Sequence, residues 1–190
     1  MSKKIFFITS NNHKVRELQD VLNLKNTGMQ IEQINEDIME IKSSDVKKIV
    51  LHKAKQSYEK FNIPLFCEDT GIFIEALNGF PGTSAKFVFK KIGLEGILTL
   101  MCRAKNRKAY MHTAICYIDK NAKEHVFDGI MKCTIAEEIK GNLGFGYDPI
   151  LIPESFEKTI GEDDSKLAII SARAKAFEKF FAIIKPQKRE

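Results

Sequence analysis

Residues 64–76 read PLFCEDTGIFIEA, and this stretch indicates how the chain folds. Its apolar opening has the length and composition of a buried β-strand, and it ends in two consecutive carboxylates, Glu68 and Asp69. After Gly71 an extended pattern resumes over residues 72–76. Because adjacent side chains of a strand point to opposite faces of the sheet, the two acids are expected to have different tasks, and one of them can face a cleft.

On both sides of this stretch, strand-like runs alternate with helical ones. Apolar or alternating runs predict further strands over residues 4–9, 29–34, 108–119, 123–130, 132–139 and 149–152. Apolar residues at helical spacing predict helices around residues 15–22, from residue 45 to about 61, in short pieces between 87 and 98, and over 167–181. This interleaving predicts a single α/β domain over residues 1–190 with a mixed sheet.

The composition narrows the class of protein. Lys and Arg number 30 against 25 Asp and Glu, and the resulting net charge of +5 suits an anionic small molecule at least as well as nucleic acid. The cysteines lack the spacing of a zinc site or a disulfide framework, so reduced, buried thiols are expected at Cys67, Cys102, Cys116 and Cys133. The apolar run near the first residue is too short for a signal peptide or a membrane span, and a cytoplasmic location follows by default.

A first candidate site is the turn TSNNHK, residues 9–14, between a predicted strand and a predicted helix. A helix N-terminus offers unpaired N–H groups and a positive dipole end, and Lys14 adds a cation, so this turn can hold phosphate. Ordinary capping by Ser10 or Asn11, with Lys14 in solvent, explains the same residues.

The acid pair is the second candidate. Mg²⁺ prefers oxygen ligands and is commonly held by one or two carboxylates together with substrate phosphates, so Asp69 and the remote Glu40 would suffice. The alternative is an acid pair that ends a strand in solvent.

A third candidate, GFGYDP at residues 144–149, alternates aromatic residues with glycines. Glycine lets a flat ligand approach the backbone, and Asp148 can accept hydrogen bonds from ring N–H groups, which favours a pocket for a nucleotide base. A simple turn whose aromatic rings fill the core is the other interpretation.

Cationic side chains form the fourth set. A triphosphate is normally bound by lysine and arginine, and the candidates are Lys53, Lys86, Lys166 and Arg173, with Ser171 beside the last. Each lysine alone is better explained as a solvated surface charge. The histidines show no metal-ligand spacing and no Ser or Cys lies in a nucleophile motif, which leaves metal-assisted hydrolysis by water as the available chemistry.

Taken together, these motifs resemble those of the inosine triphosphate pyrophosphohydrolase family, the hydrolases of noncanonical purine nucleoside triphosphates. The resemblance runs over nearly the whole chain. It is carried, in order, by TSNNHK (9–14), MEIKS (39–43), EDTGIFIEALNGFPGTSAKF (68–87), GFGYDPIL (144–151) and SARAKAF (171–177).

The resemblance implies an enzyme that uses Mg²⁺ to cut inosine, deoxyinosine and xanthosine triphosphates to monophosphate and pyrophosphate. It implies an elongated sheet flanked by helices, a substrate cleft between two lobes, and a homodimer without a nucleic-acid or membrane partner. Asp69 would be the catalytic base and, with Glu40, a metal ligand. Substrate contacts are implied for Thr9, Ser10, Asn11, Lys14, Lys53, Thr70, Lys86, Phe145, Gly146, Tyr147, Asp148, Lys166, Ser171 and Arg173.

Three positions depart from the family pattern. Ser10 replaces a usual glycine, and Ala172 stands where a histidine is expected before Arg173. Lys166 lies five residues before Ser171 instead of four, which turns it about 100° around a helix. Ala172 keeps one rival open, a related pyrophosphohydrolase with another base preference, such as one for modified pyrimidine nucleotides. The net charge of +5 and the lysine-rich helices keep open a second, a non-catalytic nucleotide- or nucleic-acid-binding module.

Overall fold

A mixed sheet forms the centre of the protein in the computed structural model, which describes residues 4–184; residues 1–3 and 185–190 of the predicted domain lie outside the described part. Within that part the sheet has seven strands, ordered β2-β1-β3-β5-β6-β7, with β4 paired to β3. The strands are β1 (Lys4–Ile8), β2 (Gln30–Ile34), β3 (Leu65–Ile74), β4 (Pro81–Gly82), β5 (Lys108–Ile118), β6 (Glu124–Ile135) and β7 (Leu151–Pro153). β1 pairs in parallel with β2 and β3, and the other pairs are antiparallel, so the predicted α/β class and mixed sheet are confirmed.

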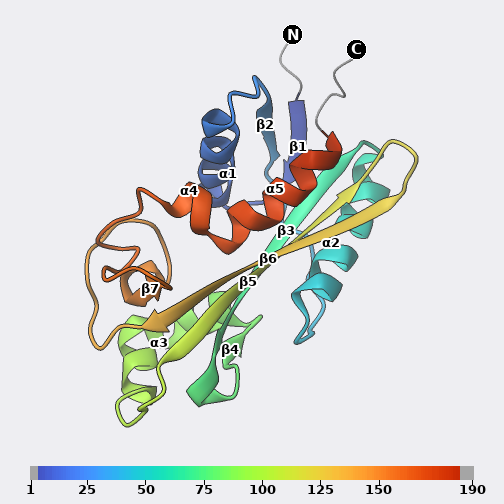
Figure 1. Ribbon diagram of the computed structural model, residues 1–190. Helices are drawn as coiled ribbons and strands as arrows, with labels where there is room; N and C mark the ends of the chain where they lie inside the picture. The colour runs from blue at the N-terminus through green and yellow to red at the C-terminus, as the bar shows by residue number, and fades with distance from the viewer. Residues whose placement is uncertain (1–3, 185–190) are drawn as a thin grey trace.

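Helices cover both faces of the sheet (Figure 1). They are α1 (Asn12–Leu24), α2 (Val46–Phe61), α3 (Ala85–Leu100), α4 (Leu167–Ile170) and α5 (Ala172–Ile184), with short 3-10 turns at Glu75–Leu77 and Asp148–Ile150. In Figure 1 the long strands β3, β5 and β6 run from an upper part, which holds α1, α5, β1 and β2, to a lower part with α3, β4 and β7. The sheet is therefore elongated, as the resemblance implied.

The two faces of β3 contact different helices. Phe66 packs against Phe177 and Phe180 of α5, with ring centroids 6.2 and 5.1 Å apart. Leu65 and Cys67, whose side chains point the other way, lie in a separate apolar cluster with α2. Glu68 continues the α5 face and Asp69 the α2 face, because side chains alternate along a strand.

Three predicted boundaries were wrong. Residues 64–76 contain one strand, β3, rather than two, because Gly71 stays in the ladder opposite His112, and a Cβ there would lie 2.7 Å from the Phe73 ring. Residues 123–139 also contain a single strand, since β6 pairs without interruption along β5 and then leaves the sheet.

The predicted final helix is broken at Ser171, whose backbone is extended (ψ 153°) between α4 and α5. The Ser171 hydroxyl accepts a hydrogen bond from the Ala174 N–H at 3.0 Å, which caps the new helix.

The prediction of buried thiols is wrong for Cys102, which is exposed just after α3. The other three cysteines are buried.

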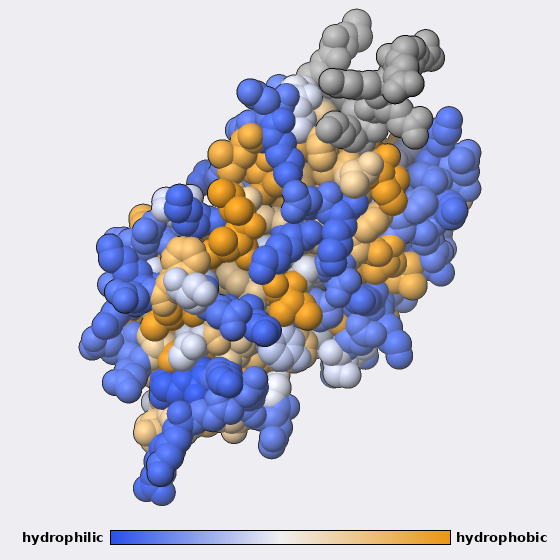
Figure 2. All heavy atoms as spheres, in the orientation of Figure 1, coloured by the Kyte–Doolittle hydropathy of each residue, from blue (hydrophilic) through white to orange (hydrophobic). Residues whose placement is uncertain are grey.

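Hydrophilic residues cover much of the face that carries α4 and α5, with apolar patches between them (Figure 2). No helix within residues 4–184 has both the length and the apolar character to cross a membrane. Against this ordinary distribution, a few charged side chains are buried: Glu17, Lys53, Glu68, Asp148 and Arg173. Burying a charge is costly unless it is paired, so these groups point to the site.

Candidate active site

The turn between β1 and α1 is capped by its own side chains. Asn11 Oδ1 accepts hydrogen bonds from the backbone N–H groups of His13 (2.9 Å) and Lys14 (3.3 Å), and Thr9 Oγ1 accepts one from Asn11 N (3.1 Å). Capping by Asn11 is therefore observed, while Ser10 is exposed. Lys14 is not free in solvent as that alternative required, because its Nζ lies 2.5 Å from a carboxylate oxygen of Glu68.

Glu68 is the centre of a buried polar cluster on the α5 face. Its carboxylate accepts a hydrogen bond from Thr70 Oγ1 at 2.5 Å and lies 3.4 Å from the guanidinium of Arg173. Burial alone would raise the pKa of Glu68, but Arg173 and Lys14 outweigh it and lower the pKa to about 2. The group is thus a permanent negative charge that holds two cations in place.

Arg173 is held from its other side by Glu17 of α1. The guanidinium donates to one Glu17 oxygen, and Ser171 Oγ donates to the other at 2.6 Å. Burial opposes the charge of Arg173, yet Glu17 and Glu68 raise its pKa. The sequence interpretation missed Glu17, whose only signal was its place one turn after Lys14 on a helix with an otherwise apolar buried side.

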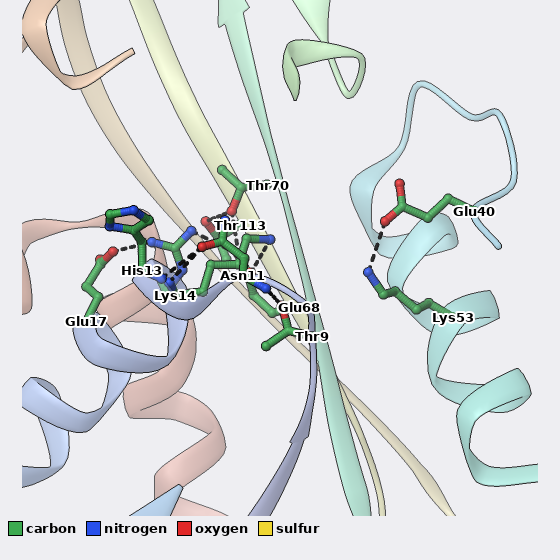
Figure 3. Close-up of polar contacts among 11 residues, drawn as sticks. Thr9, Asn11, His13, Lys14, Glu17, Glu40, Lys53, Glu68, Thr70 and Thr113 are labelled. Atoms are coloured by element: carbon green, nitrogen blue, oxygen red, sulfur yellow. Dashed lines mark hydrogen bonds and ion pairs between the residues drawn. The ribbon is translucent and has the colours of Figure 1, made fainter. Parts of the chain in front are cut away.

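On the opposite face of β3, Asp69 lies with Lys53 and Glu40. Lys53 Nζ is 2.9 Å from a Glu40 oxygen, and Figure 3 shows this pair across the strand from the Glu68 cluster. Burial lowers the pKa of Lys53, but Glu40 outweighs it and the net shift is upward. Burial also raises the pKa of Asp69 to about 6, with Lys14 acting against it. Asp69 can therefore exchange a proton near neutral pH.

Glu40 and Asp69 are the two carboxylates of this face. Residues 4–184 contain no group of three or more His, Cys, Asp or Glu side chains arranged to hold a metal ion. Two carboxylates fit Mg²⁺ when phosphate oxygens and water complete its coordination, and they would bind it weakly without them.

In the loop at residues 144–149, one aromatic side chain lies in the core and the other borders a cavity. Tyr147 is buried and its hydroxyl donates to the Ala85 carbonyl at 3.0 Å, so it fills the core. Phe145 instead stacks on His13, with centroids 5.0 Å apart, and lies 5.8 Å from Arg173 Cζ. Asp148 accepts a 2.7 Å bond from the Phe145 N–H, and burial raises the pKa of Asp148 to about 7. Gly146, with φ +65°, lets the chain turn between the two rings.

The ring pair borders a cavity of about 780 Å³ between α1 and the residues around the start of α4. Its lining includes His13, Glu17, Gly144, Phe145, Asp164 and Leu167. A volume of this size admits a small organic ligand.

Two predicted cations lie apart from both the Glu68 cluster and the Glu40–Lys53 pair. Lys86 is exposed in the first turn of α3, and the Thr83 hydroxyl before it donates to the Ser43 carbonyl at 2.6 Å, which ties this end of α3 to the Glu40 loop. Lys166 is exposed and borders a different cavity of about 280 Å³, whereas Leu167 borders both cavities. The extra residue before Ser171 thus turns a leucine, rather than the lysine, toward the ring pair.

The sequence model of the Ham1 family matches residues 5–183. This chain belongs to the Ham1 family. It is 43% identical over 185 residues to a dITP/XTP pyrophosphatase of Pyrococcus horikoshii, covering 96% of this chain and 97% of that protein. It is 41% identical over 178 residues to a dITP/XTP pyrophosphatase of Saccharolobus solfataricus, covering 93% and 91%.

Solved Ham1 structures share the fold. A HAM1 protein from Coxiella burnetii superposes with a TM-score of 0.82 at 24% identity, over 97% of this chain and all of that one. The Staphylococcus aureus Ham1 protein gives a TM-score of 0.78 at 22% identity, over 96% of this chain. The predicted family is thereby confirmed, and the elongated mixed sheet is the Ham1 fold.

Proposed function

We propose that this Ham1 protein hydrolyses the triphosphates of inosine, deoxyinosine and xanthosine to nucleoside monophosphate and pyrophosphate. Its relatives at 41–43% identity are named dITP/XTP pyrophosphatases. The observation that carries the proposal is the pair of adjacent carboxylates on β3, of which Glu68 stays ionised while Asp69 has a pKa of about 6. Two neighbouring acids whose pKa values are pushed apart are typical of a site that moves protons.

Asp69 is the proton acceptor in this reaction. A water oxygen forms a bond to the α-phosphorus, its proton passes to Asp69, and the bond from that phosphorus to the pyrophosphate oxygen breaks. Lys53 lies beside Asp69, and Lys14, which pairs with Glu68, lies on the other face of the strand. Both cations can stabilise the negative charge that develops on the phosphates as the bond breaks. Thr9 and Asn11 hold the N-terminal turn of α1 through their own hydrogen bonds, and the positive end of the helix dipole there favours a phosphate.

Glu40 and Asp69 would hold Mg²⁺ together with the substrate phosphates. When bound, the ion neutralises phosphate charge and lowers the pKa of a bound water. Lys53 now bonds Glu40, and a metal ligated by that carboxylate would leave Lys53 available to phosphate.

Phe145 and Arg173 are the base-side contacts. A 6-oxo purine presents an acceptor to Arg173, whereas adenine presents an amino group that leaves the donor unpaired, at a cost of roughly 1–3 kcal/mol per group. Asp148 accepts the hydrogen bond from the Phe145 N–H and so fixes this loop; its pKa of about 7 means that both its charged and its neutral form are populated near neutral pH.

We also propose that the protein is cytoplasmic and forms a homodimer. Gel filtration with light scattering would test the dimer.

The experiment is a pyrophosphate-release assay with inosine, xanthosine, guanosine, adenosine and uridine triphosphates, with Mg²⁺ and with EDTA. Wild type is expected to prefer inosine and xanthosine triphosphates and to stop in EDTA. Asp69→Asn is expected to lower kcat by about 10²- to 10⁴-fold, the usual contribution of a general base. The control is Asp119→Asn, which changes an acid at the β5–β6 hairpin that pairs with His125. Unchanged kcat in Asp69→Asn would remove Asp69 from this role.

A pyrophosphohydrolase with another base preference is the second candidate, and Ala172 favours it. Its side chain is buried in the apolar cluster around α3, and its carbonyl lies against Gly129, so a histidine ring would not fit there without rearrangement. The base pocket is therefore built without a histidine at this position. Preferred turnover of the uridine substrate in the same assay would support this candidate, and absence of any turnover would favour a binding module.

A further inference from the structure

His13 and Phe145 form an aromatic pair that brings two distant parts of the chain together. The imidazole lies over the phenyl ring with centroids 5.0 Å apart and planes inclined by 22°. His13 is in the first turn of α1, and Phe145 is in the loop before Asp148–Ile150. The pair joins the phosphate side of the proposed site to its base side.

The backbones on both sides of this pair are fixed, while the imidazole is free to turn. The His13 N–H is bonded to Asn11 Oδ1 at 2.9 Å, and the Phe145 N–H is bonded to Asp148 Oδ2 at 2.7 Å. The side chain of His13 is exposed, so rotation about its χ angles costs little packing. A movement of the ring alone can therefore open the face of Phe145.

The present spacing leaves no room for a third ring between them. A flat ligand sandwiched by two rings needs roughly 7 Å between them, twice the van der Waals contact of about 3.5 Å. At 5.0 Å the imidazole instead occupies the place that a planar ligand would take on Phe145. Arg173 also lies near that ring, at 5.8 Å, and is held by Glu17 and Glu68, so His13 is the partner that can move.

We propose that His13 is a substrate-binding residue that stacks on the purine base. The base takes the place of the imidazole on Phe145, and the imidazole turns outward to cover the other face of the base at the mouth of the cavity that both residues line. This proposal rests on the proposed function, because it assumes a nucleotide in this site. It adds a ring from α1 to the base side of the site, where Ala172 supplies none because its side chain is buried in the apolar cluster around α3.

The test compares two ligands that share a ribose and a phosphate and differ in the base. Binding of inosine monophosphate and of ribose 5-phosphate is measured by calorimetry on wild type, His13→Ala and His13→Phe. His13→Ala is expected to weaken the binding of inosine monophosphate by about tenfold, within the roughly five- to 150-fold loss of affinity that removal of one base–aromatic stack produces. Ribose 5-phosphate should bind all three equally, and His13→Phe should bind inosine monophosphate as wild type does.

The control is Glu178→Ala, which changes an exposed residue of α5 that pairs with Lys25 and does not line this cavity. It should leave both affinities unchanged, and melting temperatures establish that each variant is folded. Equal affinity of wild type and His13→Ala for inosine monophosphate would overturn the proposal, as would an equal loss for both ligands. If wild type hydrolyses inosine triphosphate, either result rejects the role of His13 and leaves the proposed function standing. If wild type neither binds inosine monophosphate nor hydrolyses inosine triphosphate, both the role of His13 and the proposed function are rejected.

Discussion

Replacing Glu68 by glutamine should destabilise the fold strongly at neutral pH and much less in acid. Glu68 is 1% exposed and lies against Lys14 and Arg173, and its pKa falls from the ordinary 4.5 to about 2. At about 1.4 kcal/mol per pKa unit, this shift corresponds to about 3 kcal/mol. Removing one partner from a buried ion pair costs about 3–5 kcal/mol, which is the same size.

The sign of the pH dependence follows from the lowered pKa. The contribution of ionised Glu68 to the free energy of unfolding is fully present above about pH 4.5 and is lost as the pH falls through about 2. At pH 3, between the two values, roughly 1.5 kcal/mol should remain. Urea unfolding of wild type and Glu68→Gln at pH 7 and pH 3 measures the difference at each pH.

Glu178→Gln is the matched control, because Glu178 forms an exposed ion pair with Lys25 at 2.8 Å. Its expected cost is below about 1 kcal/mol at either pH. A loss for Glu68→Gln that is below about 1 kcal/mol at pH 7, or that is the same at both pH values, would refute the reasoning from the buried cluster.

Four further predictions concern stability. Burial raises the pKa of Asp148 from 3.8 to about 7, so wild type should lose up to about 4 kcal/mol relative to Asp148→Asn as the pH rises from 4 to 8, measured by denaturant midpoints. Gly129→Ala should cost about 2 kcal/mol or more, because its Cβ would lie 2.2 Å from the Ala172 carbonyl oxygen. Gly28→Ala, with positive φ but open space, should cost only about 1 kcal/mol by the same measurement. Ser171→Ala should lower the melting temperature through loss of a helix cap worth about 1 kcal/mol; an unchanged value would contradict the capping role.

The sequence was sufficient for the order of the elements because their signals are local. Apolar residues at helical spacing predicted α1 and α2, and the alternating run at residues 108–119 predicted β5. The boundaries that failed depend on tertiary contacts. In the sequence Gly71 suggests the end of a strand, yet it remains inside β3, where the Phe73 ring occupies the space that a Cβ would need. Ser171 fits the helical pattern of its neighbours, yet its hydroxyl caps a new helix.

The site was harder to predict because its central contacts join residues far apart in the chain. Glu17 bonds Ser171 and Arg173 across more than 150 residues, and no short motif contains both ends of such a contact. His13 was noticed only as part of the TSNNHK turn and as a histidine without metal-ligand spacing, since its partner Phe145 comes from another motif. Residue types in a motif indicate chemistry, but their pairing is decided by which helix face and which loop meet in the fold.

The alternation of β3 explains why its two acids differ. Glu68 faces α1 and α5, where two cations hold it ionised with a pKa of about 2, and Asp69 faces α2, where burial raises its pKa to about 6. Their environments, rather than their side-chain types, therefore separate a fixed charge from a group that can take up a proton. A shift of the strand by one residue would exchange these roles only by turning every apolar side chain of β3 to the wrong face. The core that Phe66 and Cys67 build on the two sides thus also fixes which carboxylate is available for proton transfer.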